Sequence, residues 1–356
     1  MKKICVVIPS NIYAAPYYYI YENILTDLNS NFDVIIWDRD IIDEPVKGNK
    51  IALKLKDTAS DGRKTKIIKY FKFAHFVKKQ LKKNEYDKLI FLGTNGGTVA
   101  LLSNFISKNY KNKYWLDIRD YTFEWFKPYR MAIYNAIKSS DKCTISSPAY
   151  RDFLPEHNYI QTHNIDLRSI ESCKSRHRES NKKPIRIGFI GNIRYYEENL
   201  KILDVLKNDD RFIMQYYGAH SEKLEKYCYD NNITNVDFHG RFSPNETPNF
   251  YKKIDIINNI YGNGKIELCT ALSNKLYYAA GLHIPILVSS NTYMEKISSE
   301  YGFGFTFDYE DKNIADKLYN WYLILDKNNC KYDEFFKKVM KEYGGFLQQI
   351  KNYIKK

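Results

Sequence analysis

Long apolar runs are missing from this sequence: no stretch reaches about 18 residues, the length that a membrane-spanning helix needs. The six cysteines are scattered, with no CxxC pair and no close grouping with histidine. This distribution argues against a zinc site and a disulfide framework, and it fits a reducing cytoplasm. The apolar run within residues 1–9 is too short for a secretion signal and predicts a buried first strand. We therefore expect a cytoplasmic protein.

Length and charge are the first positive signals. With 356 residues and 44% hydrophobic content, the chain can form two domains with substantial cores. Its net charge of +13 attracts anions such as nucleic acid, anionic lipid headgroups or phosphorylated substrates. A solvated lysine-rich surface is the alternative explanation of the same charge.

An alternation of short apolar runs and helical patterns fills the first half of the chain. Strands are predicted at residues 4–8, 32–37, 88–92, 113–118 and 142–146, and helices at 17–28, 64–83, 98–108 and 129–139. Such runs between helices are typical of parallel strands that are covered on both faces. The pattern restarts at Pro184, with strands predicted at 185–190, 212–216, 236–239, 255–259, 284–289 and 304–307.

The organisation predicted from these patterns is α/β with two Rossmann-like domains. We assign residues 1–165 to the first domain and 184–330 to the second. Residues 166–183, which are polar and lack periodicity, are assigned to the connection between them. Residues 331–356 read as one or two amphipathic helices, which can pack back on the first domain.

The predicted helix at 64–83 combines lysines with apolar residues at helical spacing. It can lie on an anionic membrane with its aromatic side turned in, or it can pack on its own sheet with the lysines outward. The sequence leaves both readings open.

Turns after three strands of the second domain are candidate ligand contacts, because parallel sheets bind ligands at the carboxyl ends of their strands. Glycine in such a turn lets the backbone approach a ligand closely, and arginine can bind a diphosphate through two hydrogen bonds. A tight turn beside a surface arginine is the competing reading. The candidates are Gly191, Asn192, Arg194, Gly218, Gly240 and Arg241.

Ser273, Asn274 and Lys275 open another predicted helix. A helix N-terminus gathers unpaired backbone N–H groups and a partial positive charge, so it suits a phosphate. Lysine is electrostatically unfavourable in that first turn, which makes a partner anion worth suspecting.

In the first domain, Asp117, Arg119 and Asp120 follow an apolar strand, and residues 95–97 (Asn95, Gly96 and Gly97) form a turn into a helix. Asp120 can orient or deprotonate a sugar hydroxyl, while the other residues are candidates for acceptor contacts. An internal salt bridge and a simple helix cap are the alternatives. The Asp38-Arg39-Asp40 segment offers too few oxygen donors for a divalent cation, so we predict no metal site.

The sequence resembles the bacterial glycosyltransferases of GT-B architecture, in particular the large retaining family that builds capsules and other surface polysaccharides. The resemblance lies in residues 114–120, 144–147, 163–166 and 187–192, and most specifically in residues 273–278 with Pro285. Tyr278 stands where the family usually has a glutamate, and Asn199 stands near an expected lysine.

The resemblance implies two parallel sheets that face each other across a cleft, with the acceptor on the first domain and the donor on the second. The donor is a nucleoside-diphosphate sugar, most often a UDP- or GDP-sugar, and no metal or other cofactor is required. Arg194, Lys275 and Asp120 become candidate catalytic residues, and Tyr278 a donor contact. The expected acceptor is a glycan or a lipid-linked glycan at the inner face of the cytoplasmic membrane.

Two other functions stay open at this stage. A sugar-nucleotide 2-epimerase shares the paired-domain architecture but needs acid/base carboxylates in its cleft. A basic protein that binds membrane or nucleic acid without catalysis fits the net charge, although no nucleic-acid motif is visible and the lysines are distributed over both halves.

Overall fold

The computed structural model describes residues 3–58, 60–93, 97–174, 184–325 and 330–356. These residues divide into two compact units, which we consider separately. Unit 1 contains residues 1–163 and 341–356, and unit 2 contains residues 164–340. The chain thus leaves unit 1 and returns to it at its carboxyl end.

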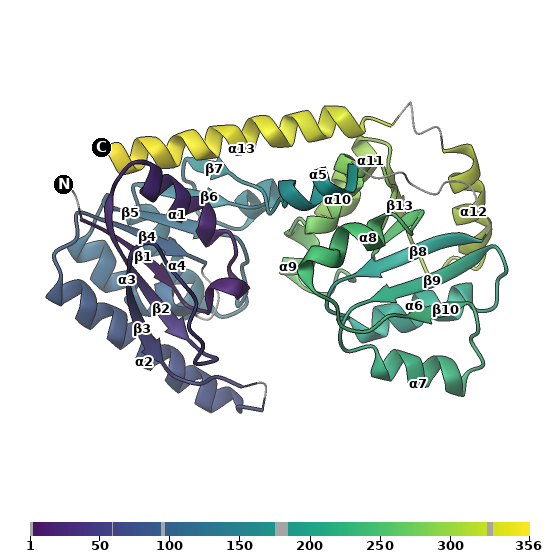
Figure 1. Cartoon of the computed structure of the whole chain (residues 1–356), viewed down its shortest axis with the longest axis horizontal. Helices are drawn as coiled ribbons and strands as arrows, with labels where there is room; N and C mark the ends of the chain where they lie inside the picture. The colour runs from purple at the N-terminus through teal and green to yellow at the C-terminus, as the bar shows by residue number, and fades with distance from the viewer. Residues whose placement is uncertain (1–2, 59, 94–96, 175–183, 326–329) are drawn as a thin grey trace. The chain divides into compact units, whose positions relative to one another are not determined.

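Unit 1 is built on a sheet of parallel strands in the order β3-β2-β1-β4-β5-β6-β7 (Figure 1). Its elements are β1 (Lys3–Ile8), α1 (Tyr18–Asp27), β2 (Asn31–Asp38), β3 (Asn49–Lys54), α2 (Arg63–Lys83), β4 (Lys88–Leu92), α3 (Thr98–Asn109), β5 (Tyr114–Ile118), α4 (Lys127–Ser139), β6 (Lys142–Ile145) and β7 (Tyr159–Gln161).

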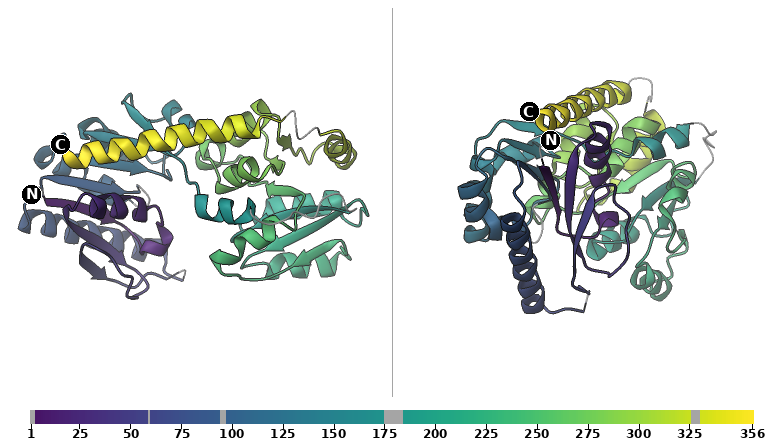
Figure 2. Two further views of the ribbon diagram at one scale, coloured as in Figure 1. Left: turned by 45° about the horizontal axis from the view of Figure 1, so that its top comes forward. Right: turned by 60° about the vertical axis from the view of Figure 1, so that its left-hand side comes forward.

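Both faces of this sheet are covered, which explains why its central strands are almost wholly apolar. Residues of α2, α3 and α4 pack with alternate strand residues such as Cys5 and Val7 on one face. On the other face, α1 and the later turns of α13 (Tyr332–Lys355) pack with Ile4, Val6 and Ile8 (Figures 1 and 2). Phe346 lies in that second core, beside Trp115 of β5.

Unit 2 has a second parallel sheet, in the order β10-β9-β8-β11-β12-β13. Its elements are α5 (Leu167–Lys174), β8 (Ile185–Ile190), α6 (Tyr196–Leu206), β9 (Phe212–Tyr217), α7 (Glu222–Asp230), β10 (Val236–Phe238), α8 (Thr247–Tyr251), β11 (Ile256–Asn259), α9 (Ile266–Thr270), α10 (Asn274–Leu282), β12 (Ile286–Val288), α11 (Tyr293–Glu300), β13 (Gly304–Thr306) and α12 (Ile314–Ile324).

The predicted α/β class with two parallel sheets is confirmed, and every predicted strand is present within a few residues. Two strands were not predicted: β3 and β7, at the edges of the first sheet. β3 is half-exposed and mixes lysines with apolar residues, so it lacks the buried pattern of a central strand.

The segment assigned to the interdomain connection, residues 166–183, differs from that prediction in its first half. Residues 167–174 form α5, whose Ile170 is buried and contacts Gly281 of α10. A short helix with one buried stripe gives only about two turns of periodicity, too little for the sequence pattern to stand out. Residues 175–183 lie outside the described residues.

Candidate functional site

The order of the strands in unit 2 reverses direction between β8 and β11. From β8 the chain proceeds to β9 and β10 on one side, and from β11 it proceeds to β12 and β13 on the other. Ligands of parallel α/β sheets bind at such a switch point, outside the carboxyl ends of the strands. The segments that leave β8 and β11 here are residues 191–195 and 260–262.

The turns after β8 and β9 are packed against each other through two predicted glycines. Gly191 N–H donates to the Tyr217 carbonyl over 2.9 Å. A Cβ atom on Gly218 would lie 1.8 Å from the Gly191 carbonyl oxygen, so only glycine fits at position 218. By contrast, a Cβ on Gly191 or Gly240 would meet nothing within 4 Å, and both have positive φ angles, 126° and 64°. Gly218 therefore shapes the turn, whereas Gly191 and Gly240 leave open space beside the backbone.

Lys275 lies in the first turn of α10, whose N-terminus is capped by Ser273 through a 3.3 Å hydrogen bond from the Lys275 N–H. The lysine is 5% exposed. Its Nζ donates to the Tyr261 hydroxyl over 2.6 Å and stands 4.1 Å from the centroid of the Phe189 ring. The helix after the cap therefore buries an ammonium group at the switch point, against Phe189 of β8 and Tyr261, which follows β11.

This ammonium has no carboxylate partner within the described part of the chain. Burying an unpaired charge costs several kcal/mol in general, and aromatic rings and one hydroxyl offset only part of it. The position at the positive end of α10 adds to the cost. A bound anion would offset both the cost of burying the ammonium and the cost of its place at the helix N-terminus, so the local electrostatics favour an anionic ligand.

Arg194 lies near the same cluster, in the turn between β8 and α6. The buried Asn199 side chain fixes this turn, because its Nδ2 donates to the carbonyls of Arg194 and Tyr195 over 2.8 and 3.0 Å. Tyr195 has a φ of 57°, and its ring lies 4.6 Å from that of Tyr261. Burial raises the pKa of Tyr195, Tyr261 adds to the rise, and the Arg194 charge opposes it. Arg194 thus neighbours Tyr195, whose ring contacts that of Tyr261, the hydrogen-bond partner of Lys275.

Other predicted donor contacts have different surroundings. Asn192, Arg241 and Asn274 are exposed around the strand ends and the start of α10. Tyr278 is 6% exposed and stacks on Tyr251 at 4.2 Å between ring centroids, and burial raises its pKa. Its side chain belongs to the hydrophobic core of unit 2, so it offers a ligand almost no surface.

Three aromatic residues of the cluster were not predicted: Phe189, Tyr195 and Tyr261. Phe189 lies near the carboxyl end of β8, Tyr195 in the turn that follows β8, and Tyr261 just after β11. Their places around the switch point were the available signal. In the sequence they resemble the many other tyrosines and phenylalanines, of which the chain has 32 and 20.

In unit 1, Asp117 and Arg119 are interior residues, 1% and 2% exposed. Arg119 Nε donates to the Asp117 carboxylate over 3.0 Å, and Asp117 also accepts from the Tyr21 hydroxyl over 2.7 Å. The guanidinium stacks on Tyr17 and lies 5.5 Å from the Phe346 ring of α13. Burial leaves neither side chain a surface for an acceptor, so the structure favours the internal salt bridge over the predicted acceptor contacts.

Asp120, by contrast, is exposed at the carboxyl end of the sheet. Gly97 precedes α3 with a φ of 85° and is partly buried. Asn95 and Gly96 lie outside the described residues. Of the predicted acceptor-side residues, Asp120 and Gly97 are thus the described ones that keep some accessible surface.

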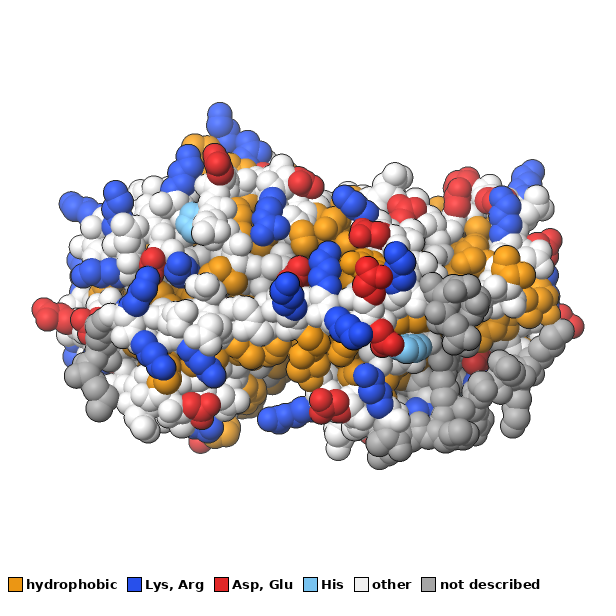
Figure 3. Space-filling model, turned by 90° about the horizontal axis from the view of Figure 1, so that it is seen from above, with side chains coloured by type: hydrophobic (Ala, Val, Ile, Leu, Met, Phe, Trp, Pro, Cys, Tyr) orange, Lys and Arg blue, Asp and Glu red, His pale blue; other side chains and the backbone are white. Residues whose placement is uncertain are grey.

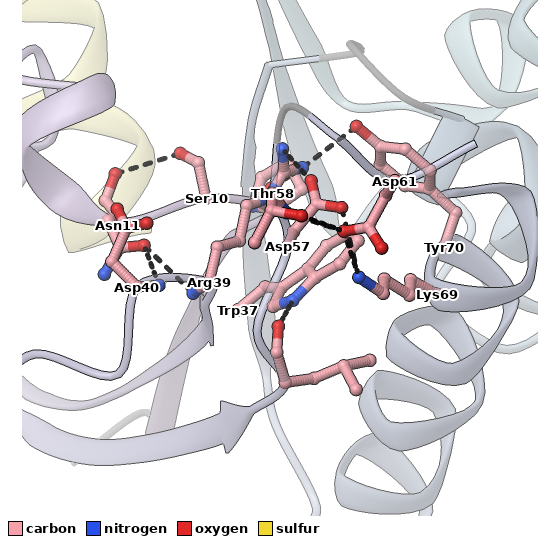
Figure 4. Close-up of polar contacts among 12 residues, drawn as sticks. Ser10, Asn11, Trp37, Arg39, Asp40, Asp57, Thr58, Asp61, Lys69 and Tyr70 are labelled. Atoms are coloured by element: carbon pink, nitrogen blue, oxygen red, sulfur yellow. Dashed lines mark hydrogen bonds and ion pairs between the residues drawn. The ribbon is translucent and has the colours of Figure 1, made fainter. Parts of the chain in front are cut away.

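The Asp38-Arg39-Asp40 segment holds neighbouring loops together (Figure 4). The Asn11 carbonyl oxygen Oδ1 accepts from the backbone N–H groups of Arg39 and Asp40 over 2.9 and 3.2 Å. The Arg39 guanidinium stacks on Trp37 at 4.1 Å and donates to the Tyr70 hydroxyl over 2.9 Å. Nowhere in the described ranges do three acidic, histidine or cysteine side chains gather as a metal ion would require.

The sequence matches no known protein-family profile and no curated protein. Its fold, however, is similar to that of many solved structures. Sucrose-phosphate synthase from Thermosynechococcus elongatus aligns with a TM-score of 0.68 at 9% identity, over 99% of this chain and 96% of that one. Anabaena HepE, solved with UDP and glucose, gives 0.64 at 11% identity, over 99% and 98% of the two chains. WaaG, a glycosyltransferase of lipopolysaccharide biosynthesis, gives 0.66 at 11% identity, over 98% and 99%.

A putative UDP-N-acetylglucosamine 2-epimerase from Listeria monocytogenes aligns less well, with a TM-score of 0.58 at 11% identity over 93% of this chain and 90% of that one. At these identities the comparisons establish architecture. The chain therefore has the two-unit α/β fold of the GT-B glycosyltransferases.

Proposed function

We propose that this protein is a glycosyltransferase that moves a sugar from a nucleoside-diphosphate sugar to a glycan acceptor, without a metal ion. The buried ammonium of Lys275 carries this proposal. It lies at the switch point of unit 2, at the positive end of α10, and it bonds to Tyr261, which contacts Tyr195 beside Arg194. Backbone amides and two cationic side chains are the groups that stabilise a leaving diphosphate as its negative charge develops.

Within this proposal, the diphosphate binds where α10 and the β8–α6 turn meet, and the open space at Gly191 and Gly240 admits the rest of the nucleotide. Asp120, on the acceptor-binding unit, orients or deprotonates the attacking hydroxyl. The fold shared with HepE, solved with UDP and glucose, supports a UDP-hexose as the donor. The fold shared with WaaG supports a cell-surface glycan as the product.

A panel of nucleotides tests the donor assignment. A ligand that binds only the folded state raises the melting temperature, by an amount equivalent to about 2.7 kcal/mol at a hundred times its Kd. We expect a shift with one of UDP, GDP, CDP and dTDP, and a smaller shift with the corresponding monophosphate because it lacks the second phosphate. Melting temperatures unchanged by all four diphosphates and their hexose conjugates would contradict the proposal.

The epimerase alternative has less support. Its structural match is weaker. On α10, the buried Tyr278 stands at the position where the glycosyltransferases that this sequence resembles usually carry a glutamate. The nucleic-acid alternative predicts a continuous basic surface. On the face that Figure 3 shows, lysine and arginine side chains stand apart and are interspersed with aspartate and glutamate.

We further propose that unit 1 contacts an anionic membrane, where lipid-linked acceptors are found. The second half of α2 packs on the sheet through Phe73, Ala74, Val77 and Leu81, as one of the two readings of this helix predicted. Its first half instead exposes Ile67, Ile68 and Phe71, the last by 57%, among exposed lysines. Apolar side chains flanked by lysines suit an anionic lipid surface. Across the described residues, no helix is both long and apolar enough to cross a bilayer.

Co-sedimentation with vesicles tests this contact. We expect binding to vesicles that contain phosphatidylglycerol and much weaker binding to pure phosphatidylcholine. Ile67→Ser, Ile68→Ser and Phe71→Ser together should lower the partition coefficient at least about tenfold, since each removes apolar area worth about 1 kcal/mol or more. The matched control is Leu323→Ser with Ile324→Ser, which changes two residues of α12 in unit 2 that are at least as exposed, by 58% and 80%. Equal binding by both variants would refute the assignment.

A further inference from the structure

Tyr261 contributes a hydroxyl group whose two hydrogen-bonding roles can be separated. A lysine ammonium only donates hydrogen bonds, so the 2.6 Å contact with Lys275 Nζ makes the Tyr261 oxygen the acceptor. The tyrosine proton must therefore point elsewhere. Among the described residues, no acceptor lies within hydrogen-bond distance of it.

The ammonium also makes this hydroxyl a stronger donor. A hydrogen bond accepted from a full positive charge draws electron density from the oxygen, and bonds in such a chain strengthen one another where water is excluded. The Lys275 charge is held in place by the Phe189 face on one side and the Tyr261 oxygen on the other. The Tyr261 ring is in turn covered by Tyr195.

Burial decides which of the two groups a ligand meets. Lys275 is 5% exposed, whereas Tyr261 is only partly buried, in the segment that leaves β11 at the switch point. A diphosphate at this switch point can reach the hydroxyl, whereas the ammonium is buried.

Building on the proposed function, we propose that the Tyr261 hydroxyl binds a phosphate oxygen of the donor directly, and that Lys275 acts through it as a positioning residue. The two side chains then form a hydrogen-bond relay: Lys275 Nζ–H donates to the Tyr261 oxygen, and the Tyr261 O–H donates to the phosphate. No proton changes place in this arrangement, and each group keeps its charge.

A double-mutant cycle tests this relay. Calorimetry measures the affinity of each variant for the nucleoside diphosphate that the wild-type protein binds. Tyr261→Phe keeps the ring and removes the hydroxyl, and Lys275→Met keeps the length and removes the charge. Each single variant should weaken binding about tenfold to a hundredfold, the range for a hydrogen bond that involves a charged group. The double variant should be no more than about threefold weaker than the worse single variant, because the interaction is lost once.

The control Tyr227→Phe removes a hydroxyl that bonds Asp204, outside the cluster, and should leave affinity unchanged. Independent losses that multiply in the double variant, or wild-type affinity in Tyr261→Phe, would overturn the relay while leaving the proposed function intact. If the wild-type protein binds no diphosphate at all, the proposed function fails and the relay fails with it. Melting temperatures of the unliganded variants distinguish lost binding from lost folding, and Tyr261→Phe alone decides the case if Lys275→Met does not fold.

Discussion

Replacing Lys275 with methionine is expected to lower kcat/KM for sugar transfer by about a hundredfold or more, because preorganised charge at a leaving group contributes on this scale. Methionine fills the same volume against Phe189 and Tyr261, so unit 2 should keep its fold. It should even become more stable without ligand, since an unpaired buried charge has been removed. Initial rates with the donor identified by the nucleotide panel, together with the melting temperature, measure both effects.

A loss of activity together with a gain in the stability of the unliganded protein distinguishes a binding role of Lys275 from a structural one. A lysine that merely supported the fold would lose both in parallel. Lys226→Met serves as the matched control, because Lys226 is an exposed lysine of unit 2 that pairs with Asp230 on α7. It should change neither rate nor melting temperature by a measurable amount. Full activity in Lys275→Met would contradict the phosphate assignment.

The sequence was sufficient to place Lys275 on a helix N-terminus, because capping residues and the strand that follows are local signals. The sequence could not show that the Lys275 ammonium is buried and that no carboxylate pairs with it in the described part of the chain. The burial of Lys275 depends on Phe189, which lies in β8, and on Tyr261, which follows β11. Tyr261 was missed for the same reason: an aromatic residue at a strand end looks like core until its neighbours are known.

Asp117 and Arg119 illustrate the converse case, in which the sequence does not show that a charged pair is buried. A carboxylate and a guanidinium at the end of β5 have the composition and position of an active-site pair. The structure buries them because α13 returns to unit 1 and places Phe346 beside the Arg119 guanidinium. The chain between Arg119 and Phe346 includes the whole of unit 2. No local pattern around Asp117 reports a covering helix so distant in sequence.

Replacing Arg119 with leucine is expected to destabilise unit 1 by about 3–5 kcal/mol, because it leaves the Asp117 carboxylate buried without its cationic partner. The variant also loses the contacts of the guanidinium with Phe346 and with the His163 carbonyl. Urea unfolding followed by tryptophan fluorescence measures the effect. Trp37, Trp115 and Trp125 belong to unit 1 and Trp321 to unit 2, so the signal is dominated by unit 1. The control Arg130→Leu removes a partly exposed pair with Glu124 and should cost about 1 kcal/mol or less.

The same variant should acquire a dependence on pH. Burial raises the pKa of Asp117 in the folded protein, and the Arg119 charge opposes that rise. Without Arg119 the pKa of the folded state rises further, while the unfolded state keeps a value near about 4. Folding then favours the protonated acid, so stability is retained at low pH and lost as the pH rises through the folded-state pKa. We therefore expect the stability of Arg119→Leu to be closer to that of the wild-type protein at pH 5 than at pH 8.

Adding Asp117→Asn, whose amide oxygen can still accept from Tyr21, should restore most of the stability at pH 8 and abolish this dependence on pH. A loss that is equal at both pH values would show that packing against Phe346, rather than the buried charge, accounts for the cost.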